Sequence, residues 1–119
     1  MKILIVDDDK NMTRTLKDIL VLSGFEADET FNGKDALCKI AQSSYDCVLS
    51  DVKMPEMDGM ALHQRIKTIQ PGLPVVLMTA HTPQEVLKKG LTEGVTKVFH
   101  KPMDMDLVIA FLQSLKTSV

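Results

Sequence analysis

Aspartates stand directly after two apolar runs of this chain. Asp7, Asp8 and Asp9 follow the run Ile3–Val6, and Asp51 follows a second short apolar run. At an effective dielectric near 20, two unit charges about 4 Å apart repel by roughly 4 kcal/mol. Water screens such charges on a flexible segment, but carboxylates fixed at the ends of buried strands need a compensating partner. A cation, a helix N-terminus and solvent are the candidates for that partner.

Two further polar side chains end apolar runs in the same way. Thr79 closes the run Pro74–Thr79, and Lys101 follows the run Val95–His100. Carboxylate oxygens are the ligands that hard divalent cations take in proteins. If these runs are neighbouring parallel strands, three carboxylates, a hydroxyl and an ammonium meet at one edge of a sheet. Such a gathering at one edge indicates a functional site.

Short apolar runs rich in β-branched residues alternate with longer segments of helical period. The predicted strands are Ile3–Val6, Phe25–Glu29, Cys47–Ser50, Pro74–Thr79 and Val95–His100. The apolar faces of the predicted helices are Met12, Leu16, Ile19 and Leu20; Ala36, Leu37, Ile40 and Ala41; Leu62, Ile66 and Ile69; Val86, Leu87 and Gly90; and Leu107, Val108, Phe111, Leu112 and Leu115. Gly24 is predicted to end the first helix in the left-handed conformation that glycine favours.

The alternation of strands and helices predicts where the polar residues lie. Five β–α units in a row favour an α/β fold, a doubly wound five-stranded parallel sheet with five helices over its two faces. In such folds ligands bind outside the carboxyl ends of the strands, at a switch point in strand order. The last helical pattern runs almost to Val119, so a single domain over residues 1–119 is expected.

Composition and charge narrow the class of protein. The chain has 119 residues, of which 45% are hydrophobic and 25% charged, as in an ordinary globular domain. A net charge of −2 gives no support to nucleic-acid binding, and no apolar run approaches the roughly 18 residues of a membrane-spanning helix. Cys38 and Cys47 lack CxxC spacing and are predicted to be reduced core residues. Because the chain start is also no signal peptide, we expect a cytoplasmic protein without nucleic-acid or membrane partners.

Four short motifs carry a resemblance to a known family. They are VDDD at 6–9, LSDVKMPEMDG at 49–59, MTA at 78–80 and HKP at 100–102. In this order and spacing, over essentially the whole chain, they resemble the receiver domain of two-component response regulators. The resemblance implies a flavodoxin-like sheet of strand order 2-1-3-4-5, in agreement with the alternation of elements.

The resemblance also implies a role for each polar residue. Asp51 is the expected phosphoacceptor, and Asp7 and Asp8 are the expected acidic pair that holds Mg²⁺ together with Asp51 and the backbone carbonyl of Lys53. A carboxylate that attacks an anionic phosphoryl group needs the incoming charge neutralised, which a hard divalent cation with oxygen ligands does. Lys101 adds a fixed positive charge against a phosphoryl oxygen.

The remaining expectations concern Thr79 and the neighbours of the site. Thr79 is expected to donate a hydroxyl hydrogen bond to the arriving phosphoryl group, and Lys101–Pro102 is the expected cis peptide bond of the family. Asp9 is expected either to face solvent or to lie favourably near the N-terminus of the first helix. Asp58 is expected to belong to a turn that leads into the third helix.

The resemblance further implies partners and an activity. The expected donor is a sensor histidine kinase or a phosphotransfer protein, and the expected target is an output domain or a downstream protein. A dimer through the face of the fourth helix, fifth strand and fifth helix is a further expectation. The domain is not expected to be an enzyme beyond its own phosphorylation and dephosphorylation.

Three other interpretations of the acidic residues differ in how well the sequence fits them. Asp7, Asp9 and Asn11 match the start of an EF-hand loop, but that loop needs Gly and Glu where Met12 and Asp18 stand. An aspartyl-phosphate hydrolase of the haloacid dehalogenase type needs DxDx[TV] after the first strand, which this sequence fits poorly. The third interpretation, a receiver-like module that binds partners regardless of phosphorylation, stays open.

The sequence departs from the family at the position three residues before Lys101. Receivers usually carry Tyr or Phe there, and this chain carries Val98. Phe99 cannot take over that role, because adjacent residues of a strand point to opposite faces. We therefore expect the signal to pass through the fourth helix and the loop Ala80–Pro83. Lys53 and His81 occupy positions that tune the phosphoryl lifetime in the family.

Overall fold

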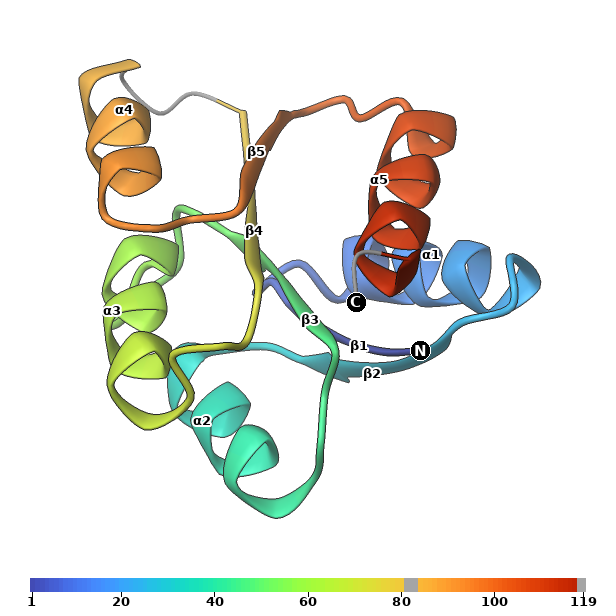
Figure 1. The fold of residues 1–119 in the computed structure, drawn as a ribbon, viewed down its shortest axis with the longest axis horizontal. Coiled ribbons are helices and arrows are strands. Elements are labelled where there is room, and N and C mark those ends of the chain that lie inside the picture. Colours follow the sequence, from blue (N-terminus) through green and yellow to red (C-terminus); the bar gives the residue numbers. More distant parts are fainter. Residues whose placement is uncertain (81–83, 118–119) are drawn as a thin grey trace.

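Figure 1 shows the computed structural model, which describes residues 1–80 and 84–117. Its five parallel strands lie in the order β2-β1-β3-β4-β5. The strands are β1 (Lys2–Val6), β2 (Glu26–Thr30), β3 (Cys47–Asp51), β4 (Val75–Thr79) and β5 (Lys97–His100). The helices are α1 (Lys10–Leu22), α2 (Gly33–Gln42), α3 (Gly59–Ile69), α4 (Gln84–Thr92) and α5 (Met105–Thr117). The predicted fold class and strand order are confirmed.

The two faces of the sheet carry separate hydrophobic cores. Alternate residues of each strand point to opposite faces, so Leu4 and Val6 pack under α2, α3 and α4, whereas Ile3 and Ile5 pack under α1 and α5. Figure 1 shows the same division, with α1 and α5 on one side of the sheet and the other three helices on the opposite side. Both faces of β1, β3 and β4 are therefore covered, which explains their nearly continuous apolar runs.

The predicted bounds of every strand differ from the observed ones at one end or both, and the differences are largest for β2 and β5. β2 lies one residue further along the chain than Phe25–Glu29. β5 begins at Lys97 and not at Val95, because Val95 belongs to the turn after α4, where its N–H donates to the Gly90 carbonyl at 2.9 Å. Gly24 ends α1 with φ +94°, as predicted.

Five side chains predicted to face the core are exposed, namely Cys38, Ala41, Ile69, Val86 and Leu107. Cys38 lies on the outer face of α2, because helical spacing puts it one turn after the exposed Lys34 and Asp35. Ile69 in the last turn of α3 and Leu107 near the start of α5 are 52% and 61% exposed. Cys47 is buried, as predicted. None of the described helices is both long and apolar enough to span a bilayer.

Gly59 fixes the distance between α3 and the carboxyl end of β3. Its N–H donates to the Val52 carbonyl at 2.8 Å. A side chain at this position would overlap the backbone oxygen of Asp51 and place its Cβ 3.0 Å from the Cα of Val52. Only glycine allows the helix to begin this close to the strand end.

We predict that Gly59→Ala lowers the free energy of unfolding by about 1–3 kcal/mol, as overpacking against rigid backbone does. Chemical denaturation with urea measures the change. Gly72→Ala is the matched control, because a Cβ at Gly72 has no heavy atom within 4 Å. The control should not be destabilised, and an equal loss in both variants would contradict the role of Gly59.

Candidate functional site

Three aspartates meet at the carboxyl ends of β1 and β3. One carboxylate oxygen from each of Asp7, Asp8 and Asp51 lies within 4.8 Å of the other two. Asp7 is buried, Asp51 is half-buried and Asp8 is exposed. Neighbouring parallel strands bring them together, because Val6 pairs with Ser50 in the register of β1 and β3. Within residues 1–80 and 84–117 this is the one acidic group that could hold a metal ion.

Lys101 lies between two of these carboxylates. Its Nζ is 3.1 Å from Oδ2 of Asp7 and 3.5 Å from Oδ1 of Asp51. Burial alone would lower the pKa of Lys101, but the hydrogen bond to Asp7 and the negative charges of Asp7 and Asp51 outweigh burial and raise it. The ammonium is therefore a fixed positive charge that offsets part of the repulsion between the two aspartates.

The charge of the Asp51 carboxylate is costly to form at these strand ends. Burial raises its pKa first, and the nearby charge of Asp7 raises it further. Lys101 and the N–H of Val52, which donates to Oδ1 of Asp51 at 3.0 Å, act in the opposite direction without reversing the shift. More positive charge at this place would stabilise the ionised form.

Thr79 lies at the same edge, one strand away from Asp51. Asp51 pairs with Met78, so Thr79 stands one residue beyond that pair at the end of β4. Its side chain is buried. The N–H of Lys101 donates to the Thr79 carbonyl at 2.7 Å, which ties the segment after β5 to the end of β4. The Lys101–Pro102 peptide bond is cis, as expected.

The loop between β3 and α3 carries Lys53, two residues after Asp51. The N–H of Val52 donates to the Met78 carbonyl at 3.0 Å, so the loop leaves the sheet from a fixed point. Glu56 has φ +68°, a left-handed conformation that non-glycine residues rarely adopt. Asp58 caps α3 by accepting a hydrogen bond from the N–H of Ala61 at 2.8 Å. The predicted turn into the third helix is confirmed.

Asp9 has a structural role and lies outside the acidic group. Its Oδ1 accepts hydrogen bonds from the N–H groups of Asn11 and Met12, at 3.0 and 3.1 Å, and so caps α1. Both expectations for Asp9 are confirmed, because the residue is exposed to solvent and lies at the N-terminus of α1. This cap begins α1 at Lys10, directly after the strand end, which is incompatible with a twelve-residue calcium loop.

Sequence patterns do not indicate the roles of two residues in α3, Gly59 and His63. By sequence, Gly59 is expected only to form part of a turn. Glycine is unfavourable within a helix because of its flexibility, so a glycine at the first helical position can indicate that another backbone segment lies close by. His63 was expected at the surface or partly buried, and it is buried on α3 with 4% of its surface exposed. His81 lies outside the described residues. Val98 and Phe99 pack on opposite faces of the sheet, as expected.

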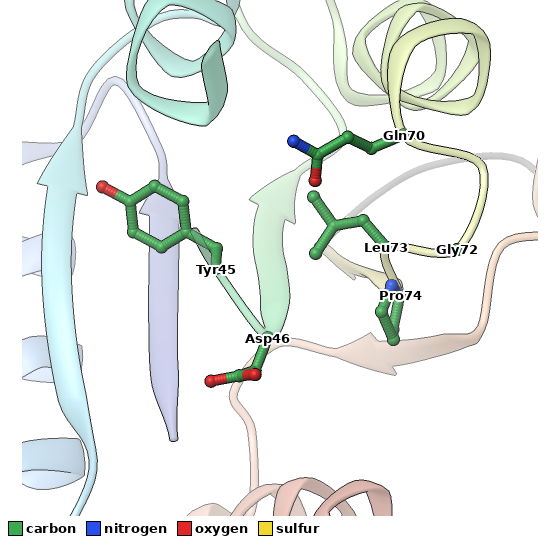
Figure 2. A pocket seen from close by; sticks show the side chains of 6 residues that line it. All are labelled: Tyr45, Asp46, Gln70, Gly72, Leu73 and Pro74. Atoms are coloured by element: carbon green, nitrogen blue, oxygen red, sulfur yellow. The ribbon is translucent and has the colours of Figure 1, made fainter. Parts of the chain in front are cut away.

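A recess lies at the opposite edge of the sheet, before β3 and β4 (Figure 2). Figure 2 shows Tyr45 and Leu73 on opposite sides of it. Its polar groups are engaged elsewhere: the hydroxyl of Tyr45 donates to Asp28, and Asp46 accepts from the N–H of Lys2 at 2.7 Å. These contacts tie the polar groups of the recess to β1 and β2.

Comparison with known proteins identifies the family. The family model described as "Response regulator receiver domain" matches residues 3–113. The DNA-binding transcriptional regulator NtrC of Salmonella typhimurium is 35% identical over 109 residues, covering 92% of this chain and 23% of that protein. The regulatory protein AtoC of Escherichia coli is 39% identical over 105 residues, covering 88% of this chain and 23% of that protein. The chain thus spans about a quarter of the length of these relatives.

Solved structures agree with the sequence relatives. The receiver domain of the Francisella response regulator 1452 superposes with a TM-score of 0.89 at 30% identity, covering 96% of this chain and 94% of that one. A two-component response regulator from Clostridium difficile superposes with a TM-score of 0.93 at 26% identity, covering 99% and 97%. The chain therefore belongs to the receiver domain family of two-component response regulators and is a phosphorelay signalling module.

Proposed function

We propose that Asp51 accepts a phosphoryl group from the phosphohistidine of a sensor histidine kinase or a phosphotransfer protein. The observation that carries this proposal is the acidic group at the strand ends, with the ammonium of Lys101 between Asp7 and Asp51. An oxygen of the Asp51 carboxylate forms a bond to phosphorus while the bond from phosphorus to the histidine nitrogen breaks. The electron pair of that bond stays with the departing imidazole.

The donor set fits Mg²⁺. Three carboxylates within reach of one another are hard oxygen ligands, and Asp8 is open to solvent, so an ion could keep several of its waters. We propose that Asp7, Asp8 and Asp51, with the backbone carbonyl of Lys53, hold the ion. When bound, Mg²⁺ neutralises negative charge on the aspartates and on the incoming phosphoryl oxygens.

The chain's own residues orient and stabilise the transferred group. Lys101 is held by Asp7 at 3.1 Å and is close enough to Asp51 to turn toward a phosphoryl oxygen on that residue. Thr79 is positioned at the neighbouring strand end, where its hydroxyl donates a hydrogen bond to the phosphoryl group. These groups are preorganised for charge that appears only on phosphorylation.

The wider role follows from the relatives. Because NtrC is by name a DNA-binding transcriptional regulator and this chain covers only 23% of it, we propose that residues 1–119 form one receiver domain that controls an output domain or a downstream protein. We place it in the cytoplasm, with no direct contact to nucleic acid or membrane, and with a dimer face on α4, β5 and α5. Its only chemistry is its own phosphorylation and dephosphorylation.

The first test is covalent labelling. With Mg²⁺ and acetyl phosphate, intact mass spectrometry should show one added phosphoryl group, and Asp51→Asn should remove it. Asp9→Asn is the matched control, because Asn caps helices as well as Asp does and should leave labelling unchanged. Normal labelling of Asp51→Asn would rule out Asp51 as acceptor. A wild type that takes no label yet binds its partner would support the phosphorylation-independent interaction module.

The second test separates the roles of the consecutive aspartates. Without metal, Asp8→Asn should raise the unfolding midpoint, because it removes one of three clustered negative charges. At a free Mg²⁺ concentration about 100 times the dissociation constant, the wild type should gain about 2.7 kcal/mol by linkage, and Asp8→Asn should lose most of that gain. Asp9→Asn should keep it. Equal stabilisation of wild type and Asp8→Asn in thermal melts would exclude Asp8 as a ligand.

The response to phosphorylation is proposed to run through α4. Leu87 and Gly90 are its buried residues, whereas Leu91 is 49% exposed, so few side chains anchor this helix. A recess of about 420 Å³ lies between α4 and β5, where Val98 contributes to the lining. Val98 is short and restricted at χ1, so it cannot swing to fill space that Thr79 vacates. Weakly anchored elements supply the low-energy openings of a fold.

Amide chemical shifts with and without beryllofluoride and Mg²⁺ test this pathway. We expect the changes to concentrate at residues 79–94, because a population shift of α4 accompanies the movement of Thr79. Val98→Tyr should change the size of these shifts, since an aromatic ring can occupy the recess. The variant should still accept a phosphoryl group on Asp51 in the labelling experiment. Changes that appear elsewhere and leave residues 79–94 unaffected would show that the pathway is wrong.

A further inference from the structure

The loop between β3 and α3 contains a strained turn. The N–H of Met57 donates to the Pro55 carbonyl at 2.7 Å, and Glu56 between them has φ +68°. A hydrogen bond across three residues with this backbone angle is a γ-turn of the rare and strained form. A residue other than glycine keeps such a conformation only where its surroundings hold it, and such residues cluster at functional sites.

The bonds at the base of this loop do not hold Glu56. The N–H of Val52 donates to the Met78 carbonyl at 3.0 Å, and the N–H of Gly59 donates back to the Val52 carbonyl at 2.8 Å. These bonds close the loop next to the sheet and leave the conformation of its middle to other contacts. The side chain of Glu56 is exposed, so packing of that side chain does not fix its backbone either.

Met57 is the neighbour of Glu56 that packs against another element. Its half-buried side chain lies over the start of α2, where a Cβ built on Gly33 would come within 2.6 Å of Sδ and 3.1 Å of Cβ of Met57. Gly33 is buried and has no positive φ, and Asn32 already caps α2 by accepting from the N–H of Asp35 at 2.7 Å. Glycine at this position therefore supplies space for Met57.

The two contacts of Met57 act on the same turn. Its N–H closes the γ-turn, and its side chain is held against α2. If the side chain leaves Gly33, Glu56 is free to return to the negative φ that residues other than glycine prefer. Such a rotation moves the chain on both sides of Glu56, and the preceding side carries Lys53.

We propose that Met57 is a positioning residue for the proposed Mg²⁺ site, which keeps the backbone carbonyl of Lys53 available to the ion. Its contact with Gly33 maintains the strained turn at Glu56, and the turn fixes the loop segment that contains Lys53. The start of α2 thereby supports the loop that follows Asp51. This inference rests on the proposed function, because it concerns the same metal site.

The test measures the Mg²⁺ affinity of the whole chain by amide chemical shift titration, without phosphodonor. Met57→Ala should raise the dissociation constant roughly 10-fold or more, as loss of a supporting contact around a metal site does. Met57→Leu should stay close to the wild type, because leucine keeps most of the apolar volume. Met60→Ala is the matched control, since Met60 is a half-buried methionine that packs over Gly90 of α4. It should lose stability and keep its Mg²⁺ affinity.

Gly33→Ala tests the same contact from the side of α2. The added Cβ displaces Met57, so this variant should also weaken Mg²⁺ binding roughly 10-fold. Adding Met57→Ala to it should weaken binding no further, because both changes remove one contact. Since alanine is more favourable than glycine in a helix, this variant keeps the test decisive if Met57→Ala folds poorly.

The outcomes separate the role of Met57 from the proposed function. Wild-type binding that Asp8→Asn abolishes, with unchanged dissociation constants in Met57→Ala and Gly33→Ala, would overturn the role of Met57 and leave the metal site standing. An equal loss of affinity in Met57→Ala and Met60→Ala would also overturn it, because that result would reflect a general loss of stability. A wild type that binds no Mg²⁺ would overturn both proposals.

Discussion

The acidic group at the carboxyl ends of the strands, here called the carboxyl edge, depends on the ammonium of Lys101 between Asp7 and Asp51. Asp7 is 1% exposed, and its carboxylate could not lie so close to Asp51 without positive charge nearby. Lys101 neutralises only part of the negative charge of the three carboxylates. Asp8 contributes a third carboxylate, and the pKa of Asp51 remains raised by burial and by Asp7. The site is built to receive more positive charge, which is the physical basis for proposing a divalent cation and a phosphoryl acceptor here.

The rest of the fold serves to bring these charges together. Parallel register places the ends of β1 and β3 side by side, and the segment after β5 is tied to the end of β4 through Thr79. Gly59 lets α3 begin against the backbone of Asp51, so the loop with Lys53 leaves and returns within a short span. Two cores, one on each face, make the sheet that carries the edge rigid.

Sequence periodicity predicted the layers well, because buried parallel strands have a composition that differs from amphipathic helices. Ends of elements were harder to predict: Val95 has the residue type of a strand, yet it closes α4. Cys38 was misplaced because residue type alone cannot say which face of a helix is buried. The polar edge was predictable, since each member ends an apolar run, whereas the role of Gly59 and the burial of His63 depend on packing between distant elements.

Direct observation of a cation at the carboxyl edge would test the central claim most directly. Crystals grown or soaked with Mn²⁺, a substitute for Mg²⁺ with a strong anomalous signal, would locate the ion independently of any assumption about the site. The account predicts one anomalous peak bound by carboxylate oxygens of Asp7, Asp8 or Asp51 and by the backbone carbonyl of Lys53. An ordered Mn²⁺ bound elsewhere, with the acidic group still paired only with Lys101, would contradict it.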